Sequence, residues 1–163
     1  MGWEAGISLF ANPSGCLQRQ LMADTRSPEQ RRRIMQSVQQ KHTGPEILVR
    51  KTLHTLGYRY RLNDRDLPGR PDLVFPRLRK VIFVHGCFWH GHGCAKGKLP
   101  KSRLEYWGPK IRRNRERDQQ ATAALRRRGW RVKTVWQCQI AATDQMTARL
   151  TRFLDCPEFL LCS

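Results

Sequence analysis

The sequence lacks any run of roughly 20 apolar residues, the length that spans a bilayer, and this argues against a transmembrane protein. It contains no internal repeat. Residues 1–21 carry Glu4 early and lack a basic start followed by a long apolar core, so we expect no secretory signal and a reducing, cytoplasmic environment. The 39% of hydrophobic residues is too high for a wholly disordered chain, and 163 residues fit one domain with a hydrophobic core.

Acidic residues are scarce. The chain has 13 acids against 31 lysines and arginines, which gives a formal charge of +18 and a pI near 10.8. Such an excess attracts a polyanion, and nucleic acid is the usual one because each neutralised phosphate releases condensed counterions. The alternative is a solvated basic surface of the ribosomal-protein kind. Charge alone says nothing about catalysis.

The pattern of residues predicts loose tails at 1–22 and 156–163 and one domain at 23–155, with Met22 as an alternative start. Ser27 and Gln30 have the spacing of a capping box that opens the first helix. Continuous apolar runs and helical spacing predict the remaining elements. The predicted helices cover residues 27–40, 43–57, 109–128 and 143–154, and the predicted strands cover 58–62, 71–75, 80–84 and 130–136.

This order predicts an α/β fold with a mixed sheet flanked by helices. Residues 80–84 form a continuous apolar run typical of a buried central strand, and 130–136 is interpreted as a second buried strand that includes Trp130 and Trp136 in the core. Thr143 is expected to cap the last helix. The expected inward-facing helix residues are Leu48, Val49, Leu53, Leu56, Ile111, Ala121, Ala124 and Leu125.

The segment 87–94 combines cysteine, histidine and glycine densely enough to predict a zinc site. Tetrahedral zinc prefers thiolate and imidazole ligands, which Cys87, His92 and Cys94 supply on one loop that Gly91 and Gly93 allow to bend. Cys138, just past a predicted strand, is the best placed fourth ligand. Four protein ligands indicate a structural metal, and His90 is then left free for chemistry. The alternative is ordinary buried cysteines beside exposed histidines.

Three acids stand within otherwise basic surroundings. Asp72 enters one predicted strand, and the next predicted strand ends at Val84 and His85. This arrangement can hold a magnesium ion over a phosphodiester, since one direct carboxylate suffices when other ligands act through water. Glu46 and Asp118 are the other candidates. Each acid alone has a simpler explanation: Asp72 as a turn residue, Glu46 at a helix N-terminus, and Asp118 paired with a neighbouring arginine at 115 or 117.

Phe88, Trp89 and Trp107 lie among basic residues, where aromatic rings can stack on bases or wedge between base steps. The alternative for Phe88 is packing beneath the zinc loop. The surrounding basic residues are Lys96, Lys98, Lys101, Arg103 and Lys110.

Five segments of the chain resemble the very short patch repair (Vsr) endonucleases, with their spacing retained over about residues 23–155. The segments are Leu67-Pro68-Gly69-Arg70-Pro71-Asp72, His85-Gly86-Cys87-Phe88-Trp89-His90, Glu116-Arg117-Asp118, Gly129-Trp130-Arg131-Val132 and Val135-Trp136-x-Cys138. The resemblance implies a core like that of the type II restriction endonucleases. It also implies magnesium-dependent nicking of double-stranded DNA on the 5′ side of the thymine in a T:G mismatch left by deamination of 5-methylcytosine.

The resemblance further implies a role for each matching residue. Asp72 is expected to bind magnesium directly, together with the backbone carbonyl of Val84, while His90 acts as the general base, as suits an imidazole. Glu46, His85 and Asp118 are expected to assist through water or from the outer shell. Phe88, Trp89 and Trp107 are the expected wedge, and the helix at 27–40 is expected to reach the minor groove.

Phe83-Val84-His85 departs from the acid-x-lysine pair of many restriction enzymes, and the missing lysine leaves the base role to His90. Family members can carry threonine where Val84 stands, so any hydroxyl role is lost here. We expect a monomer near the nucleoid; help from other mismatch-repair proteins stays open. Two other functions remain: a zinc-stabilised DNA- or RNA-binding module without catalysis, and a restriction-like nuclease with another target.

Overall fold

The structure, a computed structural model, describes residues 27, 29–30, 33, 43–100 and 103–156. None of the helices in these residues is both long and apolar enough to cross a membrane. The helices are α2 (Gly44–Thr55), α3 (Leu104–Arg127) and α4 (Thr143–Asp155), with short 3-10 turns at Pro76–Leu78, Ala95–Gly97 and Gln137–Gln139. The strands are β1 (Arg61–Leu62), β2 (Leu73–Phe75), β3 (Lys80–His85) and β4 (Arg131–Trp136).

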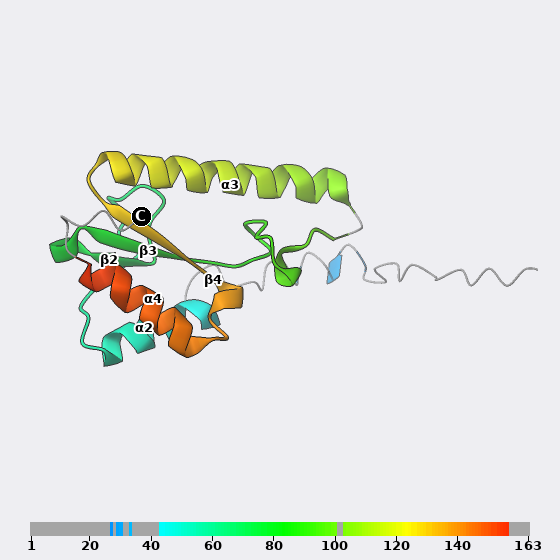
Figure 1. The fold of residues 1–163 in the computed structure, drawn as a ribbon. Helices are drawn as coiled ribbons and strands as arrows, with labels where there is room; N and C mark the ends of the chain where they lie inside the picture. The colour runs from blue at the N-terminus through cyan, green and yellow to red at the C-terminus, as the bar shows by residue number, and fades with distance from the viewer. Residues whose placement is uncertain (1–26, 28, 31–32, 34–42, 101–102, 157–163) are drawn as a thin grey trace, which may run out of the picture.

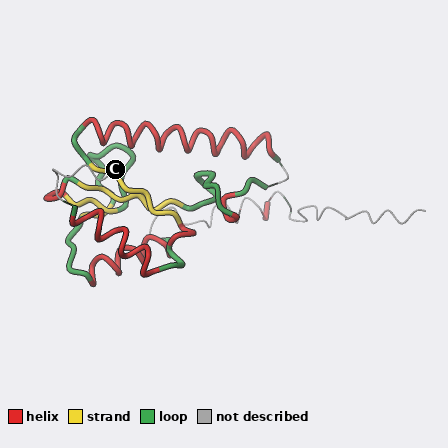
Figure 2. Tube along the Cα trace, viewed as in Figure 1, coloured by secondary structure: helices red, strands yellow, loops and turns green. Residues whose placement is uncertain are grey.

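The four strands form one mixed sheet in the order β1-β2-β3-β4. The first two pairings are antiparallel, and β3 pairs with β4 in parallel. Helix α3 lies along one face of the sheet, and α2 and α4 cover the other, as Figure 1 and the tube in Figure 2 show. The predicted mixed sheet flanked by helices is therefore confirmed.

Alternating side chains of β2 and β3 build a core on each face of the sheet. Leu73, Phe75 and Ile82 point toward α2 and α4, where they meet Leu53 and Leu150. Val74, Val81 and Phe83 point the other way and pack with Leu125 of α3. A strand that is buried on both faces reads as a continuous apolar run, which is why the sequence predicted β3 well.

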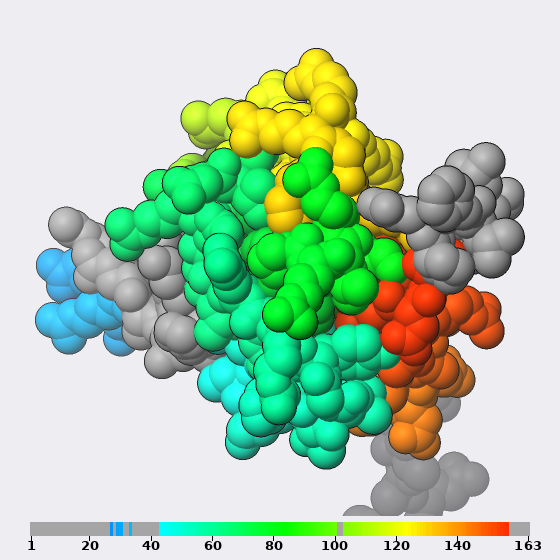
Figure 3. All heavy atoms as spheres, turned by 90° about the vertical axis from the view of Figure 1, so that its left-hand side faces the viewer, coloured from blue at the N-terminus to red at the C-terminus, as the bar shows by residue number. Residues whose placement is uncertain are grey.

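The two parallel strands end side by side, with His85 opposite Trp136 in the register. The segments that follow, the loop after β3 and the turn Gln137–Gln139, therefore leave the sheet at the same edge. The opposite end of the molecule faces the viewer in Figure 3, where the green turn between β2 and β3 lies at the surface between the yellow end of α3 and the orange-red α4. The candidate site residues that follow these strands therefore gather at the carboxyl ends of β3 and β4.

Several predicted boundaries were wrong. Helix α3 begins at Leu104 rather than at residue 109, so Pro109 lies inside the helix and removes one backbone hydrogen bond there. The strand predicted at 58–62 is reduced to Arg61–Leu62. Tyr60, just before this strand, donates its hydroxyl hydrogen to the Arg50 carbonyl at 2.9 Å. Strand β2 starts at Leu73, and the N-cap position of α4 is Ala142 rather than Thr143, with no side-chain cap hydrogen bond.

The predicted burial was also wrong at some positions. Leu48 and Leu56 are exposed, and only Val49 and Leu53 of that helix face are in the core. Strand β4 is only half-buried apart from Val135, and Trp130 and Trp136 are likewise only half-buried.

The predicted capping box at the first helix is present. The Ser27 hydroxyl oxygen accepts from the Gln30 backbone N–H at 3.2 Å, and the Gln30 side-chain oxygen accepts from the Ser27 backbone N–H at 3.0 Å. Most of the helix predicted at 27–40, the two predicted tails except Cys156, and Lys101 lie outside the described residues.

Candidate functional site

Cys87, His92, Cys94 and Cys138 converge into one cluster, as the sequence predicted. Their ligand atoms all lie within 4.8 Å of one another. Cys87 follows β3 and Cys138 follows β4, so the parallel pairing of the two strands brings the distant Cys138 to the loop. The Cys138 Sγ and His92 Nδ1 atoms are 3.5 Å apart, and the Cys138 backbone N–H donates to the Cys87 sulfur at 3.3 Å.

The donor set of this Cys/His cluster fits zinc, because three thiols and one imidazole match the ligand types of closed structural sites. A hydrogen bond from His92 is the main reason why the pKa of Cys94 is lowered to about 6, whereas burial raises the pKa of Cys87 to about 11. The loop also needs Gly91, whose φ is +60° and where an added Cβ would lie 2.8 Å from the Ile111 side chain.

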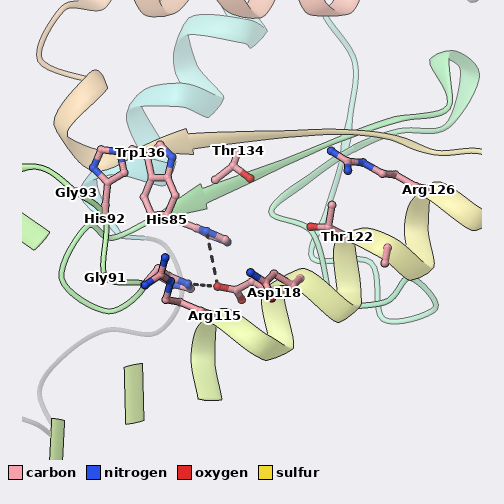
Figure 4. Close-up of a pocket in the computed structure, with 13 residues that line it drawn as sticks. His85, Gly91, His92, Gly93, Arg115, Asp118, Thr122, Arg126, Thr134 and Trp136 are labelled. Carbon is pink, nitrogen blue, oxygen red and sulfur yellow. Dashed lines mark hydrogen bonds and ion pairs between the residues drawn. The ribbon is translucent and has the colours of Figure 1, made fainter. Parts of the chain in front are cut away.

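His85, His90 and Asp118 form a second cluster beside the first. The two imidazole rings are stacked, with centroids 3.9 Å apart and planes 7° from parallel. Asp118 on α3 makes a short hydrogen bond through its Oδ2 atom to His90 Nδ1, and the same oxygen lies 4.0 Å from His85 Nδ1. Figure 4 shows Asp118 reaching from α3 toward His85, with a dashed line marking this contact.

The hydrogen bond to Asp118 has a chemical consequence for His90. A carboxylate accepts hydrogen bonds, so Nδ1 of the neutral imidazole carries the proton and Nε2 keeps a free lone pair. His90 is therefore in the tautomer that can accept a proton from water through Nε2. Asp118, which sequence patterns also allowed to pair with a neighbouring arginine, contacts both histidines, and Arg117 instead donates to Asn114 at 3.3 Å.

Asp72 lies in a cavity of about 260 Å³ that Glu46, Val84, His85 and His90 also line. The Asp72 Oδ2 atom accepts the backbone N–H of Val84 at 2.7 Å. Asp72 and His90 thus line one cavity. His85 and His90 also line a larger cavity of about 510 Å³, on whose wall Asp118 lies.

Glu46 is buried and has both carboxylate oxygens engaged. Its Oε1 atom accepts from the Thr43 hydroxyl at 2.9 Å, and its Oε2 atom accepts from Arg50 at 2.9 Å. The helix places Arg50 one turn after Glu46, on the same face. Arg50 was not predicted as a site residue, although an acid and an arginine four residues apart on a predicted helix are a signal for such a pair.

The surroundings of Asp72 and His85 shift their pKa values in directions that keep charge out of the cavity. Burial is the main reason why the pKa of Asp72 is raised to about 6, and Glu46 raises it further, while the hydrogen bond from Val84 opposes the shift. Burial, helped by His90, lowers the pKa of His85 to about 4. A half-buried carboxylate whose desolvation is not fully compensated, next to a second acid, fits a site for a cation with oxygen ligands such as magnesium.

Trp136 lies between the two clusters and was missed as a functional residue. Its ring stacks on His92 with centroids 4.3 Å apart and meets the His85 ring edge-on at 5.4 Å. Strand β4 places it opposite His85 and two residues before Cys138. The sequence predicted that Trp136 lies in the core. Its position two residues before the predicted zinc ligand Cys138 was the signal that could have placed it at the site.

Phe88, Trp89 and Trp107, the three residues expected to form the wedge, lie together in one aromatic cluster. Phe88 lies 5.0 Å from Trp107 and 5.2 Å from Trp89 between ring centroids, both edge-to-face. Asn114 of α3 anchors this loop by donating to the Trp89 carbonyl at 2.8 Å. The Lys110 ammonium lies within 5.7 Å of the Trp89 and Trp107 rings, so the cluster carries positive charge at its edge.

The chain is similar to proteins described as DNA mismatch endonucleases and type II nicking enzymes. The family model described as DNA mismatch endonuclease Vsr matches residues 23–96. The type II nicking enzyme V.XorIIP of Xanthomonas oryzae pv. oryzae is 59% identical over 134 residues, covering 82% of this chain and 98% of that protein. The DNA mismatch endonuclease Vsr of Escherichia coli is 40% identical over 126 residues, covering 77% of this chain and 81% of that protein.

Among solved structures, the catalytic domain of homing endonuclease I-Bth0305I matches 68% of this chain and 93% of that domain. The TM-score is 0.47 and the sequence identity is 16%, which is too low to establish a shared fold.

Proposed function

Because the chain belongs to the Vsr family of DNA mismatch endonucleases and is a nicking endonuclease, we propose that it cuts one DNA strand 5′ of the thymine in a T:G mismatch, with magnesium. The observation that carries the proposal is the common cavity of Asp72 and His90. A DNA-binding protein gains nothing from acids near phosphates unless a cation lies between them.

In this proposal Asp72 and the Val84 carbonyl hold magnesium, which when bound would offset charge on the phosphate and stabilise the departing 3′ oxygen. His90 takes the proton of the attacking water on Nε2. Asp118 keeps the opposite ring nitrogen protonated and stabilises the imidazolium that results. His85 and Glu46 assist from the wall of the cavity; Glu46 acts through water, and Thr43 and Arg50 hold its carboxylate in place.

The rest of the molecule supports DNA recognition. The formal charge of +18 favours the phosphate backbone. We assign Phe88, Trp89 and Trp107 to the wedge that opens the base stack, and a T:G wobble pair unstacks more easily than a matched pair, which supplies part of the selectivity. Zinc in the Cys/His cluster would hold the loop between β3 and α3 rigid.

The proposal extends to the organisation of the protein. Residues 23–155 form the endonuclease domain, built on a core of the restriction-endonuclease type, and the helix predicted at 27–40 reaches the minor groove. The protein acts as a monomer on chromosomal DNA in the bacterial cytoplasm. The host's cytosine methylase sets the bases that flank the mismatch.

The deciding experiment measures magnesium-dependent nicking of a T:G duplex beside a matched T:A duplex, for the wild type and for Asp72→Ala. We expect the wild type to cut the T:G duplex alone, and Asp72→Ala to bind DNA without cutting. Wild-type binding with no cutting at any magnesium concentration would favour the zinc-stabilised binding module. Cutting of other mismatches in preference to T:G would point to a nuclease with another target.

A further inference from the structure

His85, His90 and Asp118 have the composition of a metal site of their own. One ligand atom from each lies within 4.8 Å of the other two. The side chains come from the end of β3, the loop after it and α3, so three separate segments converge on one point. All three residues are half-buried, which leaves a route for an ion.

The donor set selects the type of ion. Two imidazoles and one carboxylate suit zinc and neighbouring first-row dications, whereas magnesium prefers oxygen ligands alone. The cavity of about 510 Å³ next to the three side chains has room for a water molecule as the fourth ligand. This site has three protein ligands and one open position, whereas the Cys/His cluster has four protein ligands and no open position. The two sites therefore differ in ligand type and coordination.

Metal binding requires the two stacked imidazole rings to tilt apart, because planes 7° from parallel do not direct both ring nitrogens at one ion. In a tetrahedral zinc site with bonds of about 2.0–2.1 Å, neighbouring ligand atoms are roughly 3.3 Å apart. The nitrogen of His85 lies 4.0 Å from the Asp118 oxygen, slightly farther than this. The His90 nitrogen makes a short hydrogen bond to the same oxygen and must give way a little.

We propose that His85, His90 and Asp118 form a second, open metal site that takes Zn²⁺ or a similar dication, and that its occupancy inhibits nicking. With the metal on Nδ1 of His90, the single proton of the neutral ring moves from Nδ1 to Nε2. Neither nitrogen can then accept a proton from water. The inhibitory part of the inference rests on the proposed function, but metal binding at the three side chains does not.

Cobalt tests the binding directly. Protein that holds one equivalent of zinc by elemental analysis is titrated with Co²⁺, which does not displace the more tightly bound zinc from the Cys/His cluster. We expect one equivalent of Co²⁺ to give visible ligand-field bands without the ultraviolet thiolate charge-transfer band of a cysteine site. These bands should vanish in His85→Ala and Asp118→Ala and persist in His54→Ala, which changes an exposed histidine of α2.

Retention of the first zinc equivalent shows that each variant is folded around its Cys/His cluster. Ligand-field bands that survive in His85→Ala and Asp118→Ala, or that never form in the wild type, would overturn the proposal. In a nicking assay at constant Mg²⁺, added Zn²⁺ should slow the wild type by about 100-fold or more, the lower end of what a general base contributes. If the wild type does not nick at all, the proposed function fails, while the cobalt spectra still decide the binding.

Discussion

The backbone N–H of Val84 donates a hydrogen bond to the Asp72 carboxylate at 2.7 Å, which ties the residue before β2 to the end of β3. This bond fixes the direction of the carboxylate but does not replace the water that burial removes. The pKa of Asp72 therefore remains raised, at about 6 against an ordinary 3.8. A group whose pKa is higher in the folded state stabilises the fold at low pH and destabilises it as the pH rises through that value.

We expect Asp72→Asn to stabilise the metal-free protein while abolishing cleavage. Asparagine keeps an acceptor oxygen for the Val84 N–H but carries no charge. A pKa raised from 3.8 to about 6 corresponds to roughly 3 kcal/mol as an upper bound. The variant should match the wild type near pH 4 and exceed its free energy of unfolding by up to this amount at pH 8. Urea unfolding in magnesium-free buffer without a chelator measures the difference, and equal stability at both pH values would contradict it.

His85 should give the opposite dependence on pH. Its pKa falls from 6.5 to about 4 in the folded protein, so the stability that its neutral form provides is present above pH 6.5 and is lost as the pH falls toward 4. His85→Asn should therefore gain relative to the wild type on acidification. In the wild type, the contributions of Asp72 and His85 to the free energy of unfolding change in opposite directions between pH 4 and 6. Parallel unfolding curves for wild type and variant across this range would show that His85 is not buried in its neutral form.

Asp118→Asn tests how the His90 ring is held. An amide can present its NH₂ group to Nδ1 and stabilise the tautomer with the proton on Nε2, which cannot act as a base. We expect kcat to fall by about 100-fold or more with little change in DNA affinity, as for loss of a general base. Glu116→Gln, an exposed acid on the same helix, is the matched control and should keep wild-type kcat. A variant with weakened DNA binding and normal kcat would assign Asp118 to binding instead.

Cys138→Ser tests the cluster that joins the two strand ends. We expect the variant to lose its equivalent of zinc and to melt at a lower temperature, since metal binding contributes directly to folding. Cys156→Ser changes a cysteine outside the cluster and should retain the metal. Elemental analysis and thermal unfolding provide both readouts. Full zinc content in a well-folded Cys138→Ser protein would exclude this residue as the fourth ligand.

The candidate site residues could be predicted from the sequence better than the boundaries of the helices and strands. The apolar run of β3 and the density of cysteine and histidine after it are local signals, so the sheet and the Cys/His cluster could be found without coordinates. Pro109 misled the prediction of α3 because proline is usual in a first turn, whereas here the helix starts five residues earlier. The first turn brings Trp107 to Phe88, a contact between distant segments that no local pattern reports.

Burial was predicted less well where it depends on the neighbours of a helix or strand. Helical spacing placed Leu48 and Leu56 in the core, but the contact with the sheet and α4 uses a narrower stripe of α2, and the two side chains are 39% and 47% exposed. The stacking of the His85 and His90 rings could likewise not be predicted from the sequence, because the spacing of the two residues in the chain does not determine how the loop folds back.

Trp136 provides the last test, because it is the side chain that lies between the Cys/His cluster and the histidine pair. Its ring stacks on His92 with centroids 4.3 Å apart and meets His85 edge-on at 5.4 Å, so it supports both rings through packing. We expect Trp136→Leu to retain zinc but to lower kcat, with KM little changed, because the His85 ring loses its lateral support. Trp136→Phe should restore much of the rate, since a smaller aromatic ring can make both contacts. Loss of zinc in Trp136→Leu would show instead that the tryptophan serves the Cys/His cluster, and equal rates for the leucine and phenylalanine variants would remove any positioning role.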